Sequence, residues 1–173
     1  MNTEERVGLV TMGGKPVTLM GSPPRIGESA PDFIAVGNDL TEVRLSQFRG
    51  RKVVIASVPS LDTAVCDLEA RRFNAEAVKL GTDVIVLVVS MDLPFAQKRW
   101  CGQAGVERVI TISDHKDASF GLAYGVLMKE VRLLARAVFV VDRDGMLRYS
   151  QLVPEVGTEP DYAAALRAVD AVV

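Results

Sequence analysis

Two apolar runs on either side of an amphipathic segment restrict the fold of this chain more than any other feature. The runs are KVVIASV, at 52–58, and DVIVLVVS, at 83–90. The second run is apolar on both faces, as central strands of a helix-covered sheet are. The segment between them has apolar residues at approximately helical spacing and is followed by Gly81, a common helix stop; these residues are Leu68, Phe73, Ala77 and Leu80. The sequence therefore predicts a strand, a helix and a second strand.

The flanking segments add a hairpin before this unit and further strands and helices after it. Two β-like runs within 7–20 enclose GGK, and glycines supply the positive φ of tight turns. The segment 92–105 predicts a helix with Asp92 near its N-cap and Pro94 in its first turn. After it we expect a strand at 107–114 and a short helix at 117–125 that ends at Gly125. Two strands joined by DRDG should follow at 135–153, and a last helix at 159–169 should have Pro160 at its start.

This order, a βαβ unit followed by ββα, is the layout of the thioredoxin-like fold, a mixed sheet with helices on both faces. The length of 173 residues fits one domain with a core of its own. We therefore predict the α/β class, with a single thioredoxin-like domain over 1–173 and an N-terminal β-hairpin at about 7–20.

Charge and hydropathy exclude several classes of partner. The 20 basic and 22 acidic residues are well mixed and give a formal net charge of −2, which favours neither nucleic acid nor an anionic membrane. The N-terminus lacks a basic stretch followed by a long apolar one, so a secretory signal is not expected. The longest apolar runs are too short to span a bilayer. We expect a cytoplasmic protein with no membrane partner.

The chain has two cysteines, Cys66 and Cys101, and one histidine, His115. Two cysteines are too few for a disulfide scaffold, and they do not form a C-x-x-C pair. A zinc site of Cys and His would have at most three scattered ligands. We expect no metal and no other cofactor, and we interpret His115 as a loop residue without a catalytic part.

Cys66 follows a short polar loop at the point where the predicted helix begins. Within PSLDTAVC, Pro59, Thr63 and Cys66 form the pattern P-x-x-x-T-x-x-C. This pattern resembles the active-site signature of the peroxiredoxins. The wider context resembles the thiol peroxidases, the atypical two-cysteine branch, in three further segments: DLPFAQKRWCG around Cys101, LLARAVFVVD around Arg136, and SQLVPEVGTEPDYAAAL near the C-terminus.

The resemblance implies a role for each matching residue. Cys66 would be the peroxidatic cysteine and Cys101 the resolving cysteine. Thr63 and Arg136 would complete the peroxide site, and Pro59 would shape its wall. The enzyme would reduce hydrogen peroxide and organic hydroperoxides through a sulfenic acid and an intramolecular disulfide. A dithiol protein such as thioredoxin would recycle it, and the resemblance also implies a homodimer.

The chemistry of peroxide reduction explains these residue types. The nucleophile must be a thiolate, and an isolated cysteine is only about 3% ionised at pH 7. Lowering a cysteine pKa from about 8.5 to about 6 raises the thiolate fraction about thirtyfold, but it reduces nucleophilicity roughly tenfold to twentyfold. Most of the rate must therefore come from orienting the O–O bond and stabilising the departing oxygen. An arginine offers several donors in a fixed fork for this purpose.

Each of these residues also has a purely structural interpretation. A free cysteine is often a small buried apolar side chain, and this applies to Cys66 and to Cys101. Thr63 could be an N-cap alone, and Arg136 could be a surface residue at the start of a strand. Solvated helix positions are expected for Arg71 and Arg72.

Two other functional classes fit the predicted fold. A thioredoxin-type disulfide oxidoreductase is disfavoured because C-x-x-C is missing. A non-enzymatic interaction module on the same scaffold is not excluded by the fold alone. Peroxide consumption by the purified protein with a dithiol reductant distinguishes the three classes.

Overall fold

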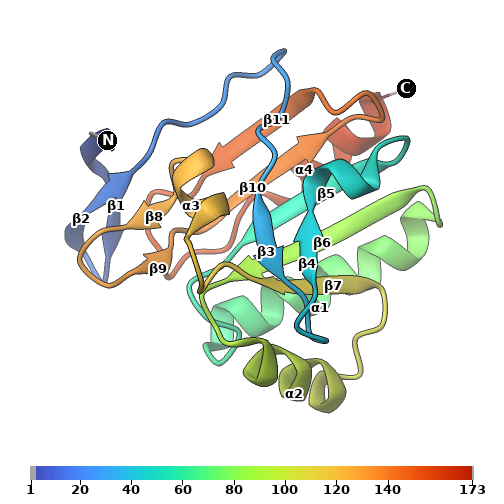
Figure 1. Ribbon diagram of the computed structural model, residues 1–173, viewed down its shortest axis with the longest axis horizontal. Coiled ribbons are helices and arrows are strands. Elements are labelled where there is room, and N and C mark those ends of the chain that lie inside the picture. Colours follow the sequence, from blue (N-terminus) through green and yellow to red (C-terminus); the bar gives the residue numbers. More distant parts are fainter. Residues whose placement is uncertain (1–2, 173) are drawn as a thin grey trace.

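A mixed sheet of seven strands forms the centre of the computed structural model, which describes residues 3–172 (Figure 1). The strand order is β11-β10-β5-β6-β7-β3-β4; β5, β6 and β7 are parallel, and the outer strands pair antiparallel. The strands are β3 Ile34–Val36, β4 Glu42–Arg44, β5 Lys52–Ser57, β6 Val84–Ser90, β7 Val109–Ser113, β10 Ala137–Val141 and β11 Leu147–Leu152.

A second, smaller sheet is built on the N-terminal hairpin. Its order is β1-β2-β8-β9, with β1 Glu5–Met12, β2 Lys15–Met20, β8 Leu127–Met128 and β9 Leu133–Leu134. Gly13 and Gly14 connect β1 to β2 and have φ values of 59° and 77°, which glycine adopts without a steric cost. The hairpin stands at one end of the large sheet, away from the C-terminal helix (Figure 1).

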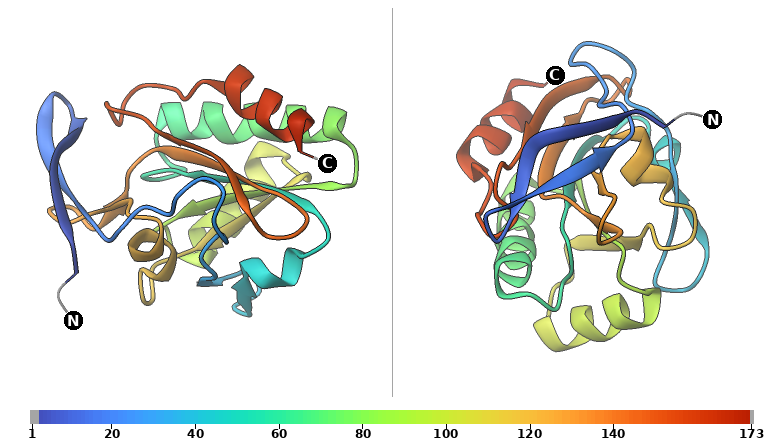
Figure 2. Two further views of the ribbon diagram at one scale, coloured as in Figure 1. Left: turned by 90° about the horizontal axis from the view of Figure 1, so that it is seen from above. Right: turned by 90° about the vertical axis from the view of Figure 1, so that its left-hand side faces the viewer.

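Helices cover both faces of the large sheet. They are α1 Ala64–Leu80, α2 Pro94–Ala104, α3 Ser119–Ala123 and α4 Tyr162–Ala171, with a 3-10 helix, η1, at Leu45–Phe48. α1 and α4 lie side by side on one face, and α3 and η1 lie on the opposite face (Figure 2). α2 packs against β7. No helix within residues 3–172 is long and apolar enough to cross a membrane.

Alternate residues of the central strands enter two different cores. In β5, Val53 and Ile55 pack in a cluster that includes Phe120 of α3. Their neighbours Val54 and Ala56 pack in the cluster that contains the buried side chains of α1 and α4. A strand buried on both faces needs apolar residues at consecutive positions, which is the pattern of the two apolar runs. The predicted fold, a mixed sheet flanked by helices with an N-terminal hairpin, is confirmed.

One local prediction is wrong. Leu68 is 50% exposed, because the buried stripe of α1 runs instead through Cys66, Glu69, Ala70, Phe73 and Ala77. Asp92 lies next to the N-cap of α2, which is Leu93, and Pro94 is the first helical residue, as predicted. The strands β3, β4, β8 and β9 were not predicted, since two or three residues are too few to show an alternation.

A carboxylate joins the hairpin to the loop after β11. Glu155 accepts hydrogen bonds from the Thr11 hydroxyl at 2.6 Å and from the amides of Gly13 and Gly14, each at 3.1 Å. The Thr11 hydrogen bond and the bonds from nearby glycine amides lower the pKa of Glu155 to about 2. The backbone adds two bonds, from Thr11 N to Pro154 O at 2.8 Å and from Val156 N to Thr11 O at 2.9 Å.

We expect Glu155→Ala to loosen the tip of the hairpin, because two glycine amides and one hydroxyl lose their common acceptor. Hydrogen exchange at Gly13 and Gly14 should be faster by roughly tenfold. Glu130→Gln is a matched control, because Glu130 accepts from the Thr18 amide elsewhere on the same hairpin. Unchanged exchange at both glycines in Glu155→Ala would show that the two backbone hydrogen bonds of Thr11 are sufficient to hold the hairpin.

Candidate active site

Cys66 is the third residue of α1 and has no exposed surface. Thr63 is extended, with φ −103° and ψ 147°, and has the N-cap position. The first helical hydrogen bond runs from Asp67 N to Thr63 O at 2.9 Å. The amides of Ala64, Val65 and Cys66 precede it and belong to the positive end of the helix dipole. The start of α1 therefore favours a negative charge on the sulfur or on an oxygen beside it.

Arg136 lies immediately before β10, is 1% exposed, and contacts Cys66. Its Nη2 donates to Cys66 Sγ at 3.3 Å, its Nε donates to Val156 O at 3.0 Å, and its Nη1 forms an ion pair with Glu69. The alternative that Arg136 is a surface residue is wrong. Three partners fix the plane of the guanidinium group, so its donors have a defined direction at the sulfur.

Glu69 belongs to this cluster and was missed by the sequence analysis. It is 0% exposed, and burial raises its pKa to about 7, although the charge of Arg136 opposes the increase. A signal was present in the sequence. Residue 69 is three positions after Cys66 in a helix, so both side chains share one face. An acidic residue on the buried face of a helix needs a cationic partner from another element.

A cavity of about 310 Å³ lies over the start of α1. Its walls come from the hairpin, the loop before α1, the first turn of α1, the residue before β10 and the loop after β11. The residues are Met12, Gly13, Pro59, Thr63, Ala64, Val65, Arg136, Glu155, Val156 and Gly157. The structure thus brings Pro59, Thr63 and Arg136 to one cavity, with Cys66 covered beside it. Most of the wall is apolar, with the guanidinium group as its buried cation.

The Thr63 hydroxyl does not cap α1. It donates to Ser60 O at 2.9 Å, and its side chain makes no capping hydrogen bond. Thr63 therefore has the N-cap position that the structural interpretation assigned to it, but without the capping bond. The hydroxyl oxygen keeps its lone pairs for another donor.

Asp92 fixes the loop that carries Pro59 and Thr63. Its carboxylate accepts from Ser60 Oγ at 2.7 Å, from Leu61 N at 2.8 Å and from Ser90 Oγ at 2.7 Å. Ser90 is the last residue of β6, so the loop is held against the end of a central strand. This positioning role is a second feature that the sequence analysis missed.

Cys101 lies apart from this cluster, in α2, and is partly exposed. Its Sγ is 3.3 Å from Thr111 Oγ1 and 4.0 Å from Asn38 Nδ2, and both cysteines are free thiols. The residues next to the two cysteines are joined, because Trp100 Nε1 donates to Asp67 Oδ1 at 2.8 Å.

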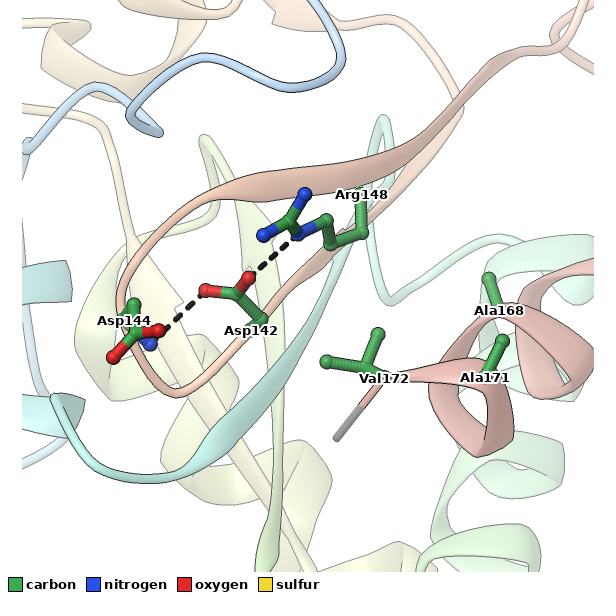
Figure 3. Close-up of a pocket in the computed structure, with 6 residues that line it drawn as sticks. All are labelled: Asp142, Asp144, Arg148, Ala168, Ala171 and Val172. Atoms are coloured by element: carbon green, nitrogen blue, oxygen red, sulfur yellow. Dashed lines mark hydrogen bonds and ion pairs between the residues drawn. The ribbon is translucent and has the colours of Figure 1, made fainter.

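A second hollow, of about 410 Å³, lies between the β10–β11 turn and the end of α4 (Figure 3). Two of its charged side chains are paired with each other, because Arg148 Nε donates to Asp142 Oδ2 at 2.6 Å. No cysteine lines it, so we do not assign the chemistry to it. Among residues 3–172, no three His, Cys, Asp or Glu side chains gather in a way that could hold a metal ion.

Comparison with known proteins places the chain among redox proteins. A family model described as Redoxin matches residues 25–166. The thiol peroxidase of Staphylococcus saprophyticus is 53% identical over 159 residues, which cover 92% of this chain and 96% of the relative. The thiol peroxidase of Bacillus subtilis strain 168 is 49% identical over 164 residues, which cover 95% of this chain and 98% of the relative.

Solved structures agree with the sequence relatives. A peroxiredoxin-like protein from Aquifex aeolicus superposes with a TM-score of 0.89 at 39% identity, and the match covers 96% of this chain and 99% of that one. A thiol peroxidase from Chromobacterium violaceum superposes with a TM-score of 0.82 at 20% identity over 93% of this chain and 95% of that one. At that identity the second match is a likeness of fold alone.

Proposed function

This chain belongs to the Redoxin family and, within it, to the thiol peroxidases, and from this premise we propose that Cys66 is the residue that attacks the peroxide. The family and the peroxiredoxin-type peroxidase class predicted from the sequence are confirmed by these relatives. The proposed substrates are hydrogen peroxide and organic hydroperoxides.

One contact carries the proposal: Arg136 Nη2 lies 3.3 Å from Cys66 Sγ at the start of α1. A fixed guanidinium and the positive end of a helix both favour the thiolate, which is the reactive form of cysteine. The first turn of α1 and Arg136 also line a cavity that could admit a peroxide.

The first step is a displacement at oxygen. The Cys66 thiolate attacks one oxygen of ROOH, the S–O bond forms as the O–O bond breaks, and RO⁻ leaves and takes up a proton to give ROH. Cys66 is oxidised to sulfenic acid and the peroxide is reduced. Charge moves from the sulfur to the leaving oxygen, so donors fixed near that oxygen lower the barrier.

We assign that stabilisation to Arg136, to Thr63 and to the amides at the start of α1. Arg136 and Thr63 line the same cavity, and Ala64 and Val65 are its neighbours on the helix. Pro59 forms part of the wall that places the peroxide. Because the Cys66 side chain is fully covered, the peroxide reaches the sulfur past the first turn of α1.

The second step joins the two cysteines. The sulfenic acid of Cys66 condenses with the Cys101 thiol to a disulfide and water. The thiols are free and have different partners, Arg136 for Cys66 and Thr111 for Cys101. A disulfide requires Cα atoms within about 4.4–6.8 Å. We therefore propose local unwinding of α1, α2 or both, with rupture of the Asp67–Trp100 hydrogen bond.

A dithiol protein of the thioredoxin type is the proposed reductant. Its thiolate attacks one sulfur of the Cys66–Cys101 disulfide, and its second thiol releases the mixed disulfide, so that two electrons and two protons return the enzyme to the dithiol form.

Cys66→Ser should abolish peroxide reduction, since a serine hydroxyl is not ionised near neutral pH and is a poor nucleophile toward peroxide. The measurement is peroxide consumption by purified protein with thioredoxin, thioredoxin reductase and NADPH. Thermal unfolding of the variant checks that it is folded. Substantial turnover by a folded Cys66→Ser protein would refute the proposal.

Arg136→Lys should reduce kcat/KM for peroxide by roughly tenfold to a thousandfold, because lysine keeps the charge and loses the directed fork. Arg143→Lys is the matched control, since Arg143 forms an exposed ion pair with Asp83. A rate for Arg136→Lys within about twofold of the parent would place the guanidinium outside the reaction.

Cys101→Ser should consume about one equivalent of peroxide and then stop as the sulfenic acid. Mass spectrometry should find a dimedone adduct on Cys66. Trp100 fluorescence should change in the parent when the disulfide forms and return with dithiol, because the Asp67–Trp100 bond breaks and re-forms. The variant should lack this change, and normal cycling of Cys101→Ser with thioredoxin would mean that another group resolves the sulfenic acid.

A further inference from the structure

Arg136 is one buried cation between two buried acids. Its Nη1 pairs with the Glu69 carboxylate and its Nη2 lies 3.3 Å from Cys66 Sγ. The exposed fractions are 1% for Arg136 and 0% for the other two. If Glu69 and Cys66 were both ionised, the cluster would carry a net charge of −1 without access to water, which is costly. The two acids therefore compete for one positive charge.

The surroundings of Glu69 disfavour its ionised form. Burial is the main cause that raises its pKa to about 7, with Arg136 opposing and the carboxylate of Glu159 adding to the increase. From α4, Tyr162 faces the same region and donates its hydroxyl to Glu159 Oε1 at 2.8 Å. Arg72 lies 4.1 Å above the Tyr162 ring and is exposed, so water screens its charge.

One oxygen of Glu69 is unsatisfied. Oε1 has no hydrogen-bond partner among residues 3–172, whereas Oε2 contacts Arg136. When a carboxylate is buried, each oxygen loses its hydrogen bonds to water, and an oxygen without a protein donor has no replacement for them. A neutral carboxyl group at this position is less costly to bury than a carboxylate, and it leaves Arg136 to the thiolate.

We propose that Glu69 holds a proton while Cys66 is a thiolate and releases it when Cys66 is oxidised. The inference rests on the proposed function, in which Cys66 attacks the peroxide. Glu69 contacts Arg136 and does not line the cavity, so it is a positioning residue that acts through the guanidinium.

The protons balance over the cycle. Cys66–S⁻ and ROOH give Cys66–SOH and RO⁻. RO⁻ takes up a proton from water to give ROH, and the Glu69 carboxyl replaces that proton and becomes a carboxylate. Condensation with Cys101 releases only water. When the dithiol reductant restores the Cys66 thiol, that thiol ionises and its proton returns to Glu69. The buried cluster then keeps the same total charge before and after the attack.

Two measurements on one turnover test this inference. Infrared difference spectra before and after one equivalent of peroxide, recorded at about pH 6, should show loss of the carbonyl stretch of a protonated carboxyl group in the parent. A pH indicator in weak buffer should register almost no proton uptake. Glu69→Gln should show no carboxyl loss and should take up about one proton per peroxide. Its peroxide reaction should be slower by less than about tenfold, since glutamine keeps an acceptor for Arg136.

Glu76→Gln is the matched control, because Glu76 lies on the same helix and pairs with Lys79 at the surface. It should behave as the parent in both measurements. An unchanged carboxyl band in the parent while peroxide is consumed would overturn the inference and leave the proposed function standing. Failure to consume peroxide at all would instead refute the proposed function. If Glu69→Gln does not fold, the carboxyl band of the parent still tests the inference, because an unchanged band overturns it.

Discussion

The site depends on a single buried guanidinium group. Arg136 connects α1, through Cys66 and Glu69, to the loop after β11, through Val156 O. A cation without water is stable only when its donors are satisfied, so each of these contacts constrains the others. The contacts that stabilise the buried guanidinium group also orient its Nη2 toward the Cys66 sulfur. The packing of the site therefore sets the geometry of its polar contacts.

The hairpin gives the cavity a wall that the large sheet does not supply. Met12 and Gly13 come from the N-terminal hairpin, and Glu155 joins them to the loop whose carbonyl group fixes Arg136. The small sheet is thereby coupled to the orientation of the guanidinium through two residues of one loop.

The two cysteines have different surroundings. Cys66 is buried at a helix start, and Cys101 is partly exposed beside Thr111. The Asp67–Trp100 hydrogen bond joins their helices and stabilises the arrangement in which both thiols are free. In the proposed cycle this arrangement is lost when the disulfide forms, so the cycle alternates between an ordered site and local opening of the helices.

The layers of the fold and the position of Cys66 between a loop and a helix could be predicted from the sequence. A strand buried on both faces must be apolar at consecutive positions, and a helix start is marked by nearby residues, so both signals are local in the chain. The burial of Arg136, the Glu69 ion pair, the role of Asp92 and the Glu155 contact with the hairpin came only from the tertiary structure. Each of these features depends on contacts between residues that are distant in sequence. A polar residue is predicted to be exposed unless its buried partner is known. Leu68 shows the converse, because an apolar residue near the buried stripe of α1 points to solvent once the phase of the helix is set by the residues that pack on the sheet.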